Sequence, residues 1–419
     1  MRPSSHPRGR LLADSEYPFN LLTLTANVPR RYYNWACNMS NETPLNGLKV
    51  LELGSSVAVP YGTWILGTLG ATVVKIERPE VGDDCRHWGT GWYHGVSGFF
   101  VALNAGKKSV IVDLSNEEQR SILRQYIINE VDIVVQNLRP GQVEKLGLDA
   151  NSLLAEKDTL IYVNSGAFGA KGPLNMRPGY DPLMQAFGGI MSVTGEEGRP
   201  PVRVGTSIVD MGTGMWCALG VLAALRNLEK TGKGGHVDAS LFETALGWMN
   251  YHATSYFGDG SIAERRGSSG PGMAPYQAYN CADGYLIIAA PNDRLFTTLS
   301  VILGHPNWAK DDRFDTNPHR WDNRATLNVL IEEVTRTQTM AHWQGKLEEA
   351  GIPSAPLQSI DAVVAHPQTE ALDIIQETED GRFKLMGMPL SFDGVRPPQR
   401  TGSPELGADN DILFGGKPL

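Results

Sequence analysis

Short apolar runs recur along the first half of the chain and are separated by segments with helical character. The runs are KVLEL (49–53), ATVVKIE (71–77), SVIVDL (109–114), VDIVV (131–135) and TLIYVNS (159–165). Helices are predicted between runs, at 60–70 and 116–127. Because strands that alternate with helices form βαβ units, this pattern predicts a mostly parallel sheet. The expected fold class is therefore α/β, with a Rossmann-like large domain.

The second half of the chain follows a different pattern. A long helical stretch at 208–230 ends at the glycine-rich KTGKGG, and a second apolar helix follows HVDASLFE. After a Gly/Ser/Pro loop at 258–275, the run GYLIIAA precedes helices predicted at 292–302, 320–335 and 340–349. We therefore assign 39–240 and 351–419 to the large domain. Linker helices and a smaller α/β domain are assigned to 241–350.

Residues 1–38 have no periodic pattern, and their arginines outnumber the acids Asp14 and Glu16. Such a composition fits a transit peptide, or equally an upstream extension before a start at Met39. We favour the extension and expect it to be poorly ordered. The cysteines are far apart and form no C-x-x-C pair, which indicates a reducing compartment. The expected location is the cytoplasm, with mitochondria as the alternative if the head is a transit peptide.

Bulk composition narrows the classes of partner. The 419 residues are 41% hydrophobic and 20% charged, as in ordinary globular proteins. A net charge of −9 argues against binding of nucleic acid through bulk charge, so an anionic ligand must meet a local group of Lys and Arg. The longest apolar run, 214–225, is shorter than the roughly 20 residues of a membrane span and is expected to be a buried helix.

Common cofactor motifs are missing. The loop after the first predicted strand reads GSSVAVP (54–60), without the glycines of G-x-G-x-x-G that let a pyrophosphate approach the backbone. No P-loop and no H-E-x-x-H are found, and no His lies between His94 and His236. We therefore expect no bound prosthetic group, no metal, and no ATP use.

Two features remain as candidate chemistry. Asp181 stands alone between a Pro-Gly-Tyr turn and an apolar run, where it is either a helix N-cap or a functional acid. Basic side chains lie at or just past the predicted strand ends, where open α/β sheets bind ligands. As a group in an acidic protein they indicate a phosphorylated ligand; they are Arg78, Arg86, Lys107, Lys108, Arg139 and Lys145.

The order of several longer blocks makes a resemblance recognisable between about Pro44 and Gly394. The blocks are PLNGLKVLEL, LGATVVKIERPEVGDDCR, NAGKKSVIVDL, VQNLRPGQVEKLGL, SGAFGAKGP, RPGYDPLMQAFGG, KTGKGGHVDASLFE, APYQAYNCADGY and DDRFDTNPHR. The chain resembles the family III coenzyme A transferases, also called CaiB/BaiF, which include formyl-CoA transferase and carnitine CoA-transferase. The resemblance implies an interlocked homodimer whose substrates are acyl-CoA and a carboxylic acid.

By resemblance, Asp181 is the catalytic nucleophile. An aspartate with an ordinary pKa of about 3.9 is ionised at neutral pH and needs no base. It attacks a thioester to form a mixed anhydride and then an enzyme-bound CoA thioester. Backbone N–H groups at the start of the following helix, or in the lid loop, are expected to stabilise the oxyanion.

The resemblance also assigns residues to binding. It places CoA against the large domain, with contacts expected from Val57, Arg78, Arg86, Asn137, Leu138, Arg139, Lys145 and Phe168. A glycine-rich loop is expected to close as a lid over the intermediates; its residues are Gly267, Ser268, Ser269, Gly270 and Gly272. Beside it, Arg265 and Arg266 are hypothesised to bind the far carboxylate of a dicarboxylic acyl group.

The sequence departs from the family pattern at four places, one of which is the predicted lid loop, which is less glycine-rich than in formyl-CoA transferase. Val57 stands where formyl-CoA transferase has Gln, and Phe168 where a Tyr is common, which weighs against formate or oxalate as substrate. The block LGADN (406–410) replaces a histidine-bearing LGEHT.

Two other functions stay open. An α-methylacyl-CoA racemase has a related sequence but pairs the Asp with an upstream His and tends to have His in place of Tyr180. With no His from 95 to 235, that proton transfer lacks its second partner. The other alternative is a non-catalytic CoA-binding protein in which Asp181 only caps a helix.

Overall fold

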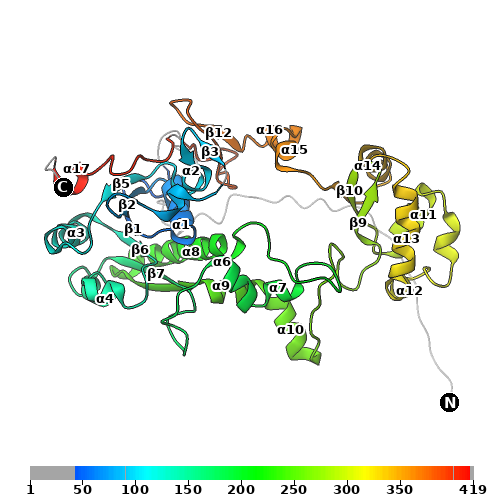
Figure 1. Ribbon diagram of the computed structural model, residues 1–419, viewed down its shortest axis with the longest axis horizontal. Coiled ribbons are helices and arrows are strands. Elements are labelled where there is room, and N and C mark those ends of the chain that lie inside the picture. The colour runs from blue at the N-terminus through cyan, green and yellow to red at the C-terminus, as the bar shows by residue number, and fades with distance from the viewer. Residues whose placement is uncertain (1–42, 90, 400, 416–419) are drawn as a thin grey trace, which may run out of the picture. The chain divides into compact units, whose positions relative to one another are not determined.

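A six-stranded parallel sheet forms the centre of the large domain (Figure 1). The computed structural model describes residues 43–415 except 90 and 400, so the expectation for residues 1–38 lies outside the described residues. The strand order is β5-β2-β1-β6-β7-β8, and every neighbouring pair is parallel. The bounds are β1 (Lys49–Leu53), β2 (Thr72–Glu77), β5 (Lys108–Ile111), β6 (Ile133–Gln136), β7 (Ile161–Gly166) and β8 (Gly235–Ser240). This confirms the α/β class and the five predicted strands; β8 was not predicted.

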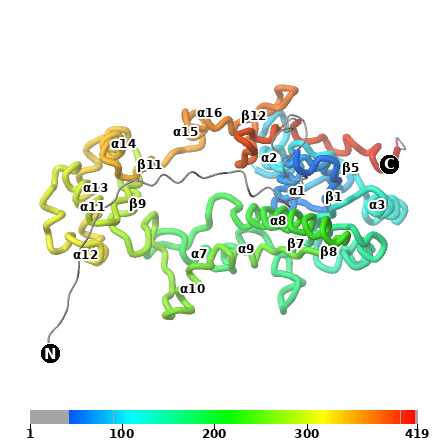
Figure 2. The backbone as a smooth tube through the Cα atoms, turned by 180° about the vertical axis from the view of Figure 1, so that it is seen from behind, coloured from blue at the N-terminus to red at the C-terminus, as the bar shows by residue number. Residues whose placement is uncertain are grey.

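Helices cover both faces of the sheet, because alternate strand residues point to opposite sides. On one face, Val50 of β1 packs in a core with residues of α1 (Ala58–Thr68) and α8 (Ile208–Thr231). On the other face, Leu51 and Leu53 join a core with α3 (Glu117–Glu130) and α5 (Ala150–Leu154). Figures 1 and 2 both show α1 and α8 side by side.

Helix α8 corrects the expectation of a buried helix. By length and composition alone, its 24 residues could span a bilayer. The sequence prediction counted only the apolar run 214–225, which is shorter than the helix. One side packs on the sheet through Cys217 and Val221. The other side leaves apolar residues 37–52% exposed, namely Met215, Trp216, Leu219 and Leu222.

The other elements before residue 260 are short. They are β3 (Trp92–Tyr93), β4 (Val96–Ser97), α2 (Gly98–Asn104), α4 (Gln142–Leu146), α6 (Asp181–Phe187), α7 (Ile190–Val193), α9 (Leu241–Trp248) and α10 (Asn250–Asp259). The C-terminal region adds α15 (Ile360–Val364), α16 (Pro367–Ala371), β12 (Ile375–Glu377), β13 (Lys384–Met386) and α17 (Asp411–Phe414). Its last segment runs along the edge strand β5, where Asp409 Oδ2 accepts from Ser109 N at 2.9 Å.

A second core forms around an antiparallel sheet of order β11-β10-β9. Its strands are β9 (Tyr276–Cys281), β10 (Gly284–Ala289) and β11 (Ser354–Pro356), and its helices are α11 (Asp293–Ile302), α12 (Asn317–Asp322), α13 (Arg324–Thr335) and α14 (Met340–Glu349). The helix predicted at 320–335 is divided at Asn323, which belongs to neither α12 nor α13.

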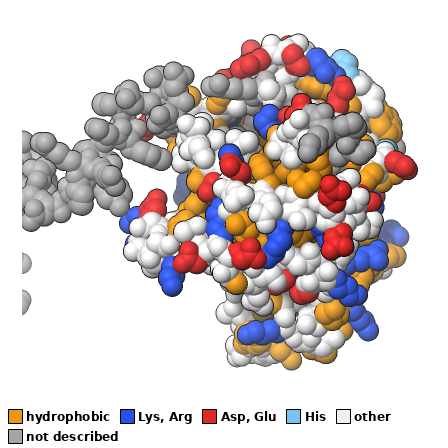
Figure 3. All heavy atoms as spheres, turned by 90° about the vertical axis from the view of Figure 1, so that its left-hand side faces the viewer, with side chains coloured by type: hydrophobic (Ala, Val, Ile, Leu, Met, Phe, Trp, Pro, Cys, Tyr) orange, Lys and Arg blue, Asp and Glu red, His pale blue; other side chains and the backbone are white. Residues whose placement is uncertain are grey.

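Charge on the face around α3 and α4 is mixed. Figure 3 shows Lys and Arg interspersed with Asp and Glu across it. Charges of both signs on one face weaken each other's long-range field.

Candidate active site

The carboxyl ends of β1 and β6 lie side by side, at the point where the strand order reverses. The turn from Gly54 to Val57 follows β1, and Asn137 follows β6. Asn137 binds this turn twice: its Oδ1 accepts from Ser55 N, and its Nδ2 donates to Ser55 O, both at 3.0 Å. The fold thus brings Val57, Asn137 and Leu138 to the crevice where doubly wound sheets bind ligands.

Asp181 is the first residue of α6, but it does not cap that helix. Tyr180 occupies the N-cap position, and Pro182, which has no N–H, follows Asp181 in the first turn. The carboxylate instead reaches the first turn of α8, where Oδ2 accepts from Val209 N at 2.8 Å and Asp210 N at 3.1 Å. The residue is 2% exposed. Asp181 therefore closes the amino end of a different, longer helix.

Gln185 holds the other carboxylate oxygen. It lies one turn along α6, fully buried, and its Nε2 donates to Asp181 Oδ1 at 2.6 Å. Its Oε1 accepts from Val204 N at 2.8 Å, which fixes the orientation of the amide. A carboxylate can accept about four hydrogen bonds, two on each oxygen. Oδ2 accepts two and Oδ1 accepts one, so one acceptor position remains open on Oδ1.

A second carboxyl group lies beside this one. Burial, together with the negative charge of Asp181, raises the pKa of Asp210 to about 7. Near neutral pH the Asp210 side chain is thus divided between its acid and its ionised form. The pair concentrates up to two negative charges at the amino end of α8.

Helix α1 closes the site from a third side. Ala58 shares a buried apolar cluster with Met184 of α6 and Val209 of α8. A Cβ on Gly62 would lie 2.7 Å from the carbonyl oxygen of Gly214, so only glycine permits this approach of α1 to α8. The amino ends of three helices therefore converge near Asp181, and their partial positive charges favour anions.

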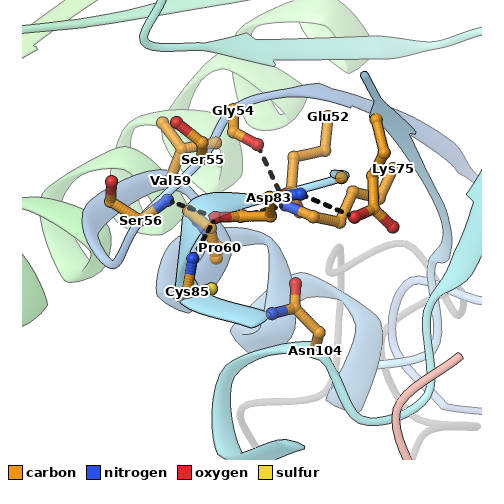
Figure 4. Close-up of polar contacts among 12 residues, drawn as sticks. Glu52, Gly54, Ser55, Ser56, Val59, Pro60, Lys75, Asp83, Cys85 and Asn104 are labelled. Atoms are coloured by element: carbon orange, nitrogen blue, oxygen red, sulfur yellow. Dashed lines mark hydrogen bonds and ion pairs between the residues drawn. The ribbon is translucent and has the colours of Figure 1, made fainter. Parts of the chain in front are cut away.

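Beneath the turn after β1 lies a buried group of charges, which we call the ion cluster: Glu52, Lys75, Asp83 and Lys107. Figure 4 shows the first three. Lys75 Nζ lies 2.6 Å from Glu52 Oε1 and 2.7 Å from Asp83 Oδ2. Lys107 Nζ lies 2.8 Å from Glu52 Oε2. No sequence motif predicted this cluster as a unit, although Glu52 and Lys75 interrupt two apolar strands at paired positions.

Burial and pairing act against each other in the ion cluster. Burial works to raise the pKa of Glu52, but Lys107 and Lys75 outweigh it and hold that pKa below its ordinary value. Burial works to lower the pKa of Lys75, and the charges of Glu52 and Asp83 raise it above the ordinary value. Burial lowers the pKa of Lys107 to about 8. Burial works to raise the pKa of Asp83, but Lys75 outweighs it and holds that pKa below its ordinary value, so three of the four groups are stabilised in their charged forms.

Comparison with known proteins identifies the family. The sequence model described as CoA-transferase family III matches residues 45–410. The chain belongs to this family. It is 35% identical over 365 residues to the acetyl-CoA:oxalate CoA-transferase of Acetobacter aceti, covering 87% of this chain and 93% of that one. Human succinyl-CoA:glutarate CoA-transferase is 31% identical over 373 residues, covering 88% and 85%.

A solved structure gives the same result for the fold. A CaiB/BaiF family protein from Brucella suis superposes with a TM-score of 0.83 and 37% identity, covering 90% of this chain and 99% of that one. The family expectation from the sequence blocks is confirmed, and the chain is a CoA-transferase by family.

The basic residues of this CoA-transferase divide into paired and unpaired groups. Arg86 binds Glu77 at 2.7 Å, Arg78 pairs with Asp84, and Lys108 lies 3.1 Å from Asp409. Lys107 belongs to the ion cluster. Arg139 and Lys145 are exposed, and within the described part of the chain neither makes an ion pair. An anionic ligand at this edge would therefore meet Arg139 and Lys145 most readily.

The other residues expected from the resemblance lie in two places. Phe168 packs edge-on against Phe187, with ring centroids 5.2 Å apart, near the end of α6. The expected lid is tied elsewhere: Gly267 N donates to Gly195 O at 2.8 Å, Ser268 Oγ accepts from Ala278 N at 2.9 Å, and Gly270 N donates to Tyr276 O at 3.0 Å. The hydrogen bonds of these lid residues, as far as the chain is described, do not reach α6.

The two arginines beside the lid differ in their surroundings. The Nε atom of Arg265 is buried without a hydrogen-bond partner among the described residues. Arg266 lies over the ring of Trp321, with its guanidinium carbon 5.4 Å from the centroid. In residues 43–415, apart from the two not described, no group of three His, Cys, Asp or Glu side chains is arranged to hold a metal ion.

Proposed function

We propose that this family III enzyme moves CoA from an acyl-CoA thioester to a free carboxylic acid through covalent intermediates on Asp181. The observation that carries the proposal is the state of that carboxylate. It is buried and oriented by three N–H donors, and one acceptor position stays open on Oδ1. An oriented anion in a dry site is a prepared nucleophile.

The first step forms a mixed anhydride. Asp181 Oδ1 attacks the thioester carbonyl carbon, a C–O bond forms, and the C–S bond breaks. CoA leaves as a thiolate with the electron pair of that bond. No proton, oxidant or ATP is required, because one acyl bond replaces another.

In the second step the thiolate attacks the carbonyl carbon of Asp181. Negative charge then develops on Oδ2, which already accepts from Val209 N and Asp210 N at 2.8 and 3.1 Å. These distances are those of an effective oxyanion hole, worth about 3 kcal/mol per donor. The donor acid leaves as a carboxylate, and the enzyme holds CoA as an aspartyl thioester. The acceptor carboxylate then reverses both steps.

The start of α8 therefore takes the role expected of the helix after Asp181. In α6 the second position is Pro182, which has no N–H to donate. The positive end of the dipole of the 24-residue helix α8 also lies at the negative charge on Asp181 Oδ2. In the first step, negative charge develops on the carbonyl oxygen of the substrate thioester. We propose that N–H groups of the lid loop stabilise that oxygen.

A second copy of the chain is part of this proposal. The side of α8 away from the sheet exposes apolar residues, and α10 exposes Tyr251, Tyr256 and Phe257 by 65%, 56% and 80%. An apolar surface of this kind usually marks an interface. We propose that it is covered in the interlocked homodimer that the resemblance implies.

The acyl group is proposed to be dicarboxylic. Succinyl-CoA and glutarate, in the name of the human relative, belong to this class; the name of the relative from Acetobacter aceti pairs dicarboxylic oxalate with a monocarboxylic acetyl group. In this chain, Arg265 has a buried Nε without a partner, as expected of a cation that awaits an anionic ligand. Arg266 lies next to it along the chain.

A mass measurement separates the three functions. The protein is incubated with succinyl-CoA, quenched and digested, and the peptide containing Asp181 is weighed. A transferase shows a CoA or acyl adduct on that peptide. A racemase shows exchange of the α-proton of a 2-methylacyl-CoA without an adduct, and a non-catalytic binder shows neither.

A further inference from the structure

The ion cluster has no task in the chemistry assigned to Asp181. Removing charges from water costs free energy, and buried ion pairs are often no more stabilising than apolar residues of the same volume. Stability alone therefore does not account for charges at Lys75 and Asp83, which are almost fully buried. The geometry that these charges impose on their neighbours is the better explanation.

Two members of the cluster bind the backbone of the turn from Gly54 to Val57, here called the β1–α1 turn. Lys75 Nζ donates to Gly54 O at 2.9 Å, and Asp83 Oδ1 accepts from Ser56 N at 3.0 Å. Figure 4 shows both contacts converging from one side. Asn137 holds Ser55, so side chains from three other segments bind three consecutive residues of the turn.

The turn needs this support because of its backbone conformation. Ser56 has a φ of +71°, in the left-handed region that is unfavourable for an L-residue. The contact with Asp83 opposes relaxation to negative φ. The salt bridge from Lys75 to Asp83 Oδ2, at 2.7 Å, in turn keeps that carboxylate ionised and in place.

The turn leads directly to the site. Val57 is the N-cap of α1, and the next residue, Ala58, packs with Met184 and Val209, the neighbours of Asp181. On its other side the turn faces Asn137, in the crevice of the sheet. A rotation at Ser56 would therefore displace the wall shared by the crevice and the aspartate.

We propose that Lys75 and Asp83 are positioning residues that hold the β1–α1 turn in the shape that binds acyl-CoA. They act through the turn and touch no substrate. This inference rests on the proposed function, because it takes acyl-CoA as the occupant of the crevice.

The test compares Asp83→Asn with Thr63→Val in the full-length protein. Thr63 is equally buried and bonds to Glu52 of the same cluster, but it does not contact the turn. Steady-state rates are measured with succinyl-CoA and glutarate. We expect Asp83→Asn to raise the KM for succinyl-CoA about tenfold or more, the loss of a hydrogen bond to a charged group. The KM for glutarate, and both KM values of Thr63→Val, should stay within twofold of the parent.

A second pair of variants tests the route through Ser56. Glycine adopts positive φ without penalty, so Asp83→Asn should raise the KM for succinyl-CoA less in a Ser56→Gly background. Ser56→Pro leaves every charge in place but forbids positive φ, and it should raise that KM even if Asp83→Asn does not fold.

Three results would overturn the inference: an unchanged KM for succinyl-CoA in Asp83→Asn and Ser56→Pro, an equal rise for both substrates, or the same rise in both Ser56 backgrounds. Failure of the proposed function looks different, because the parent enzyme would then form no adduct on Asp181. If the parent forms the adduct but the variants do not raise the KM for succinyl-CoA selectively, only the positioning role of Lys75 and Asp83 is refuted.

Discussion

Gln185 Nε2 donates to Asp181 Oδ1 across one turn of α6, at 2.6 Å, while its own Oε1 is held by Val204 N. The hydrogen bond from Val204 N fixes the orientation of the amide, so that its Nε2 donates to the oxygen that we propose as the nucleophile. This pairing sets the plane of the carboxylate before any substrate binds.

Replacing Gln185 tests this orientation. Gln185→Met keeps the length of the side chain and removes the donor, and kcat should fall about 10- to 100-fold, as for the loss of a hydrogen bond to a charged group. The matched control is Gln344→Met in α14, where Gln344 donates to Glu348, also four residues away, at 2.7 Å on the exposed surface. Equal kcat in both variants would show that Gln185 has no part in orienting Asp181.

Asp181→Asn removes the nucleophile and nearly preserves the volume of the side chain. Transfer should fall by about 10⁴-fold or more, the scale seen when covalent catalysis is lost. CoA affinity, measured by calorimetry, should stay within a few-fold of the parent, because the contacts assigned to CoA lie on the strand-end loops. Turnover at the parental rate would refute the covalent scheme.

Asp210 predicts a pH dependence of stability. Burial and the charge of Asp181 raise its pKa from 3.8 to about 7 in the folded protein. The folded state therefore binds this proton more tightly than the unfolded state between about pH 4 and pH 7. The resulting stabilisation is complete below pH 4 and is lost as the pH rises to about 7.

The measurement is the difference in Tm between the parent and Asp210→Asn at a series of pH values. Other groups titrate in both proteins, so their contributions cancel in this difference. The Tm of the parent relative to the variant should decline from pH 4 to pH 7 and then level off. A difference that does not change with pH would mean that Asp210 titrates normally.

Arg265 predicts selection for dicarboxylic acyl groups. Arg265→Ala should lower kcat/KM for succinyl-CoA about tenfold or more, because the far carboxylate of the succinyl group would lose its ion pair. Butyryl-CoA has no such carboxylate, so its kcat/KM should stay within twofold of the parent value. Arg266→Ala, whose guanidinium already lies over Trp321, serves as the neighbouring comparison. If the parent and both variants use the two thioesters equally well, neither arginine reads the acyl chain.

The exposed aromatic residues of α10 predict an oligomer. Phe257 is 80% exposed, and Phe257→Asp should shift the protein from dimer toward monomer in analytical ultracentrifugation, because a charge would be buried at the interface. Val301→Asp alters an exposed apolar residue of α11 and should leave the dimer intact. A monomeric parent would exclude the homodimer.

The apolar strands were predictable because parallel strands are buried on both faces and form nearly continuous Val, Ile and Leu runs. For this reason β1, β2, β5, β6 and β7 were recognised, while β8 was not. At the edge of the sheet, the segment GHVDAS is only partly buried and carries His236 and Asp238, which leaves no apolar run to recognise.

The sequence by itself determined the family and pointed to Asp181, because both depend on the local order of residues. Only the tertiary structure showed that this carboxylate binds the N–H groups of Val209 and Asp210, 28 and 29 residues further along the chain. It likewise joined Glu52 to Lys75 and Lys107 beneath the turn before α1. Such contacts form when folded strands and helices bring distant residues together, and no local pattern of residues specifies them.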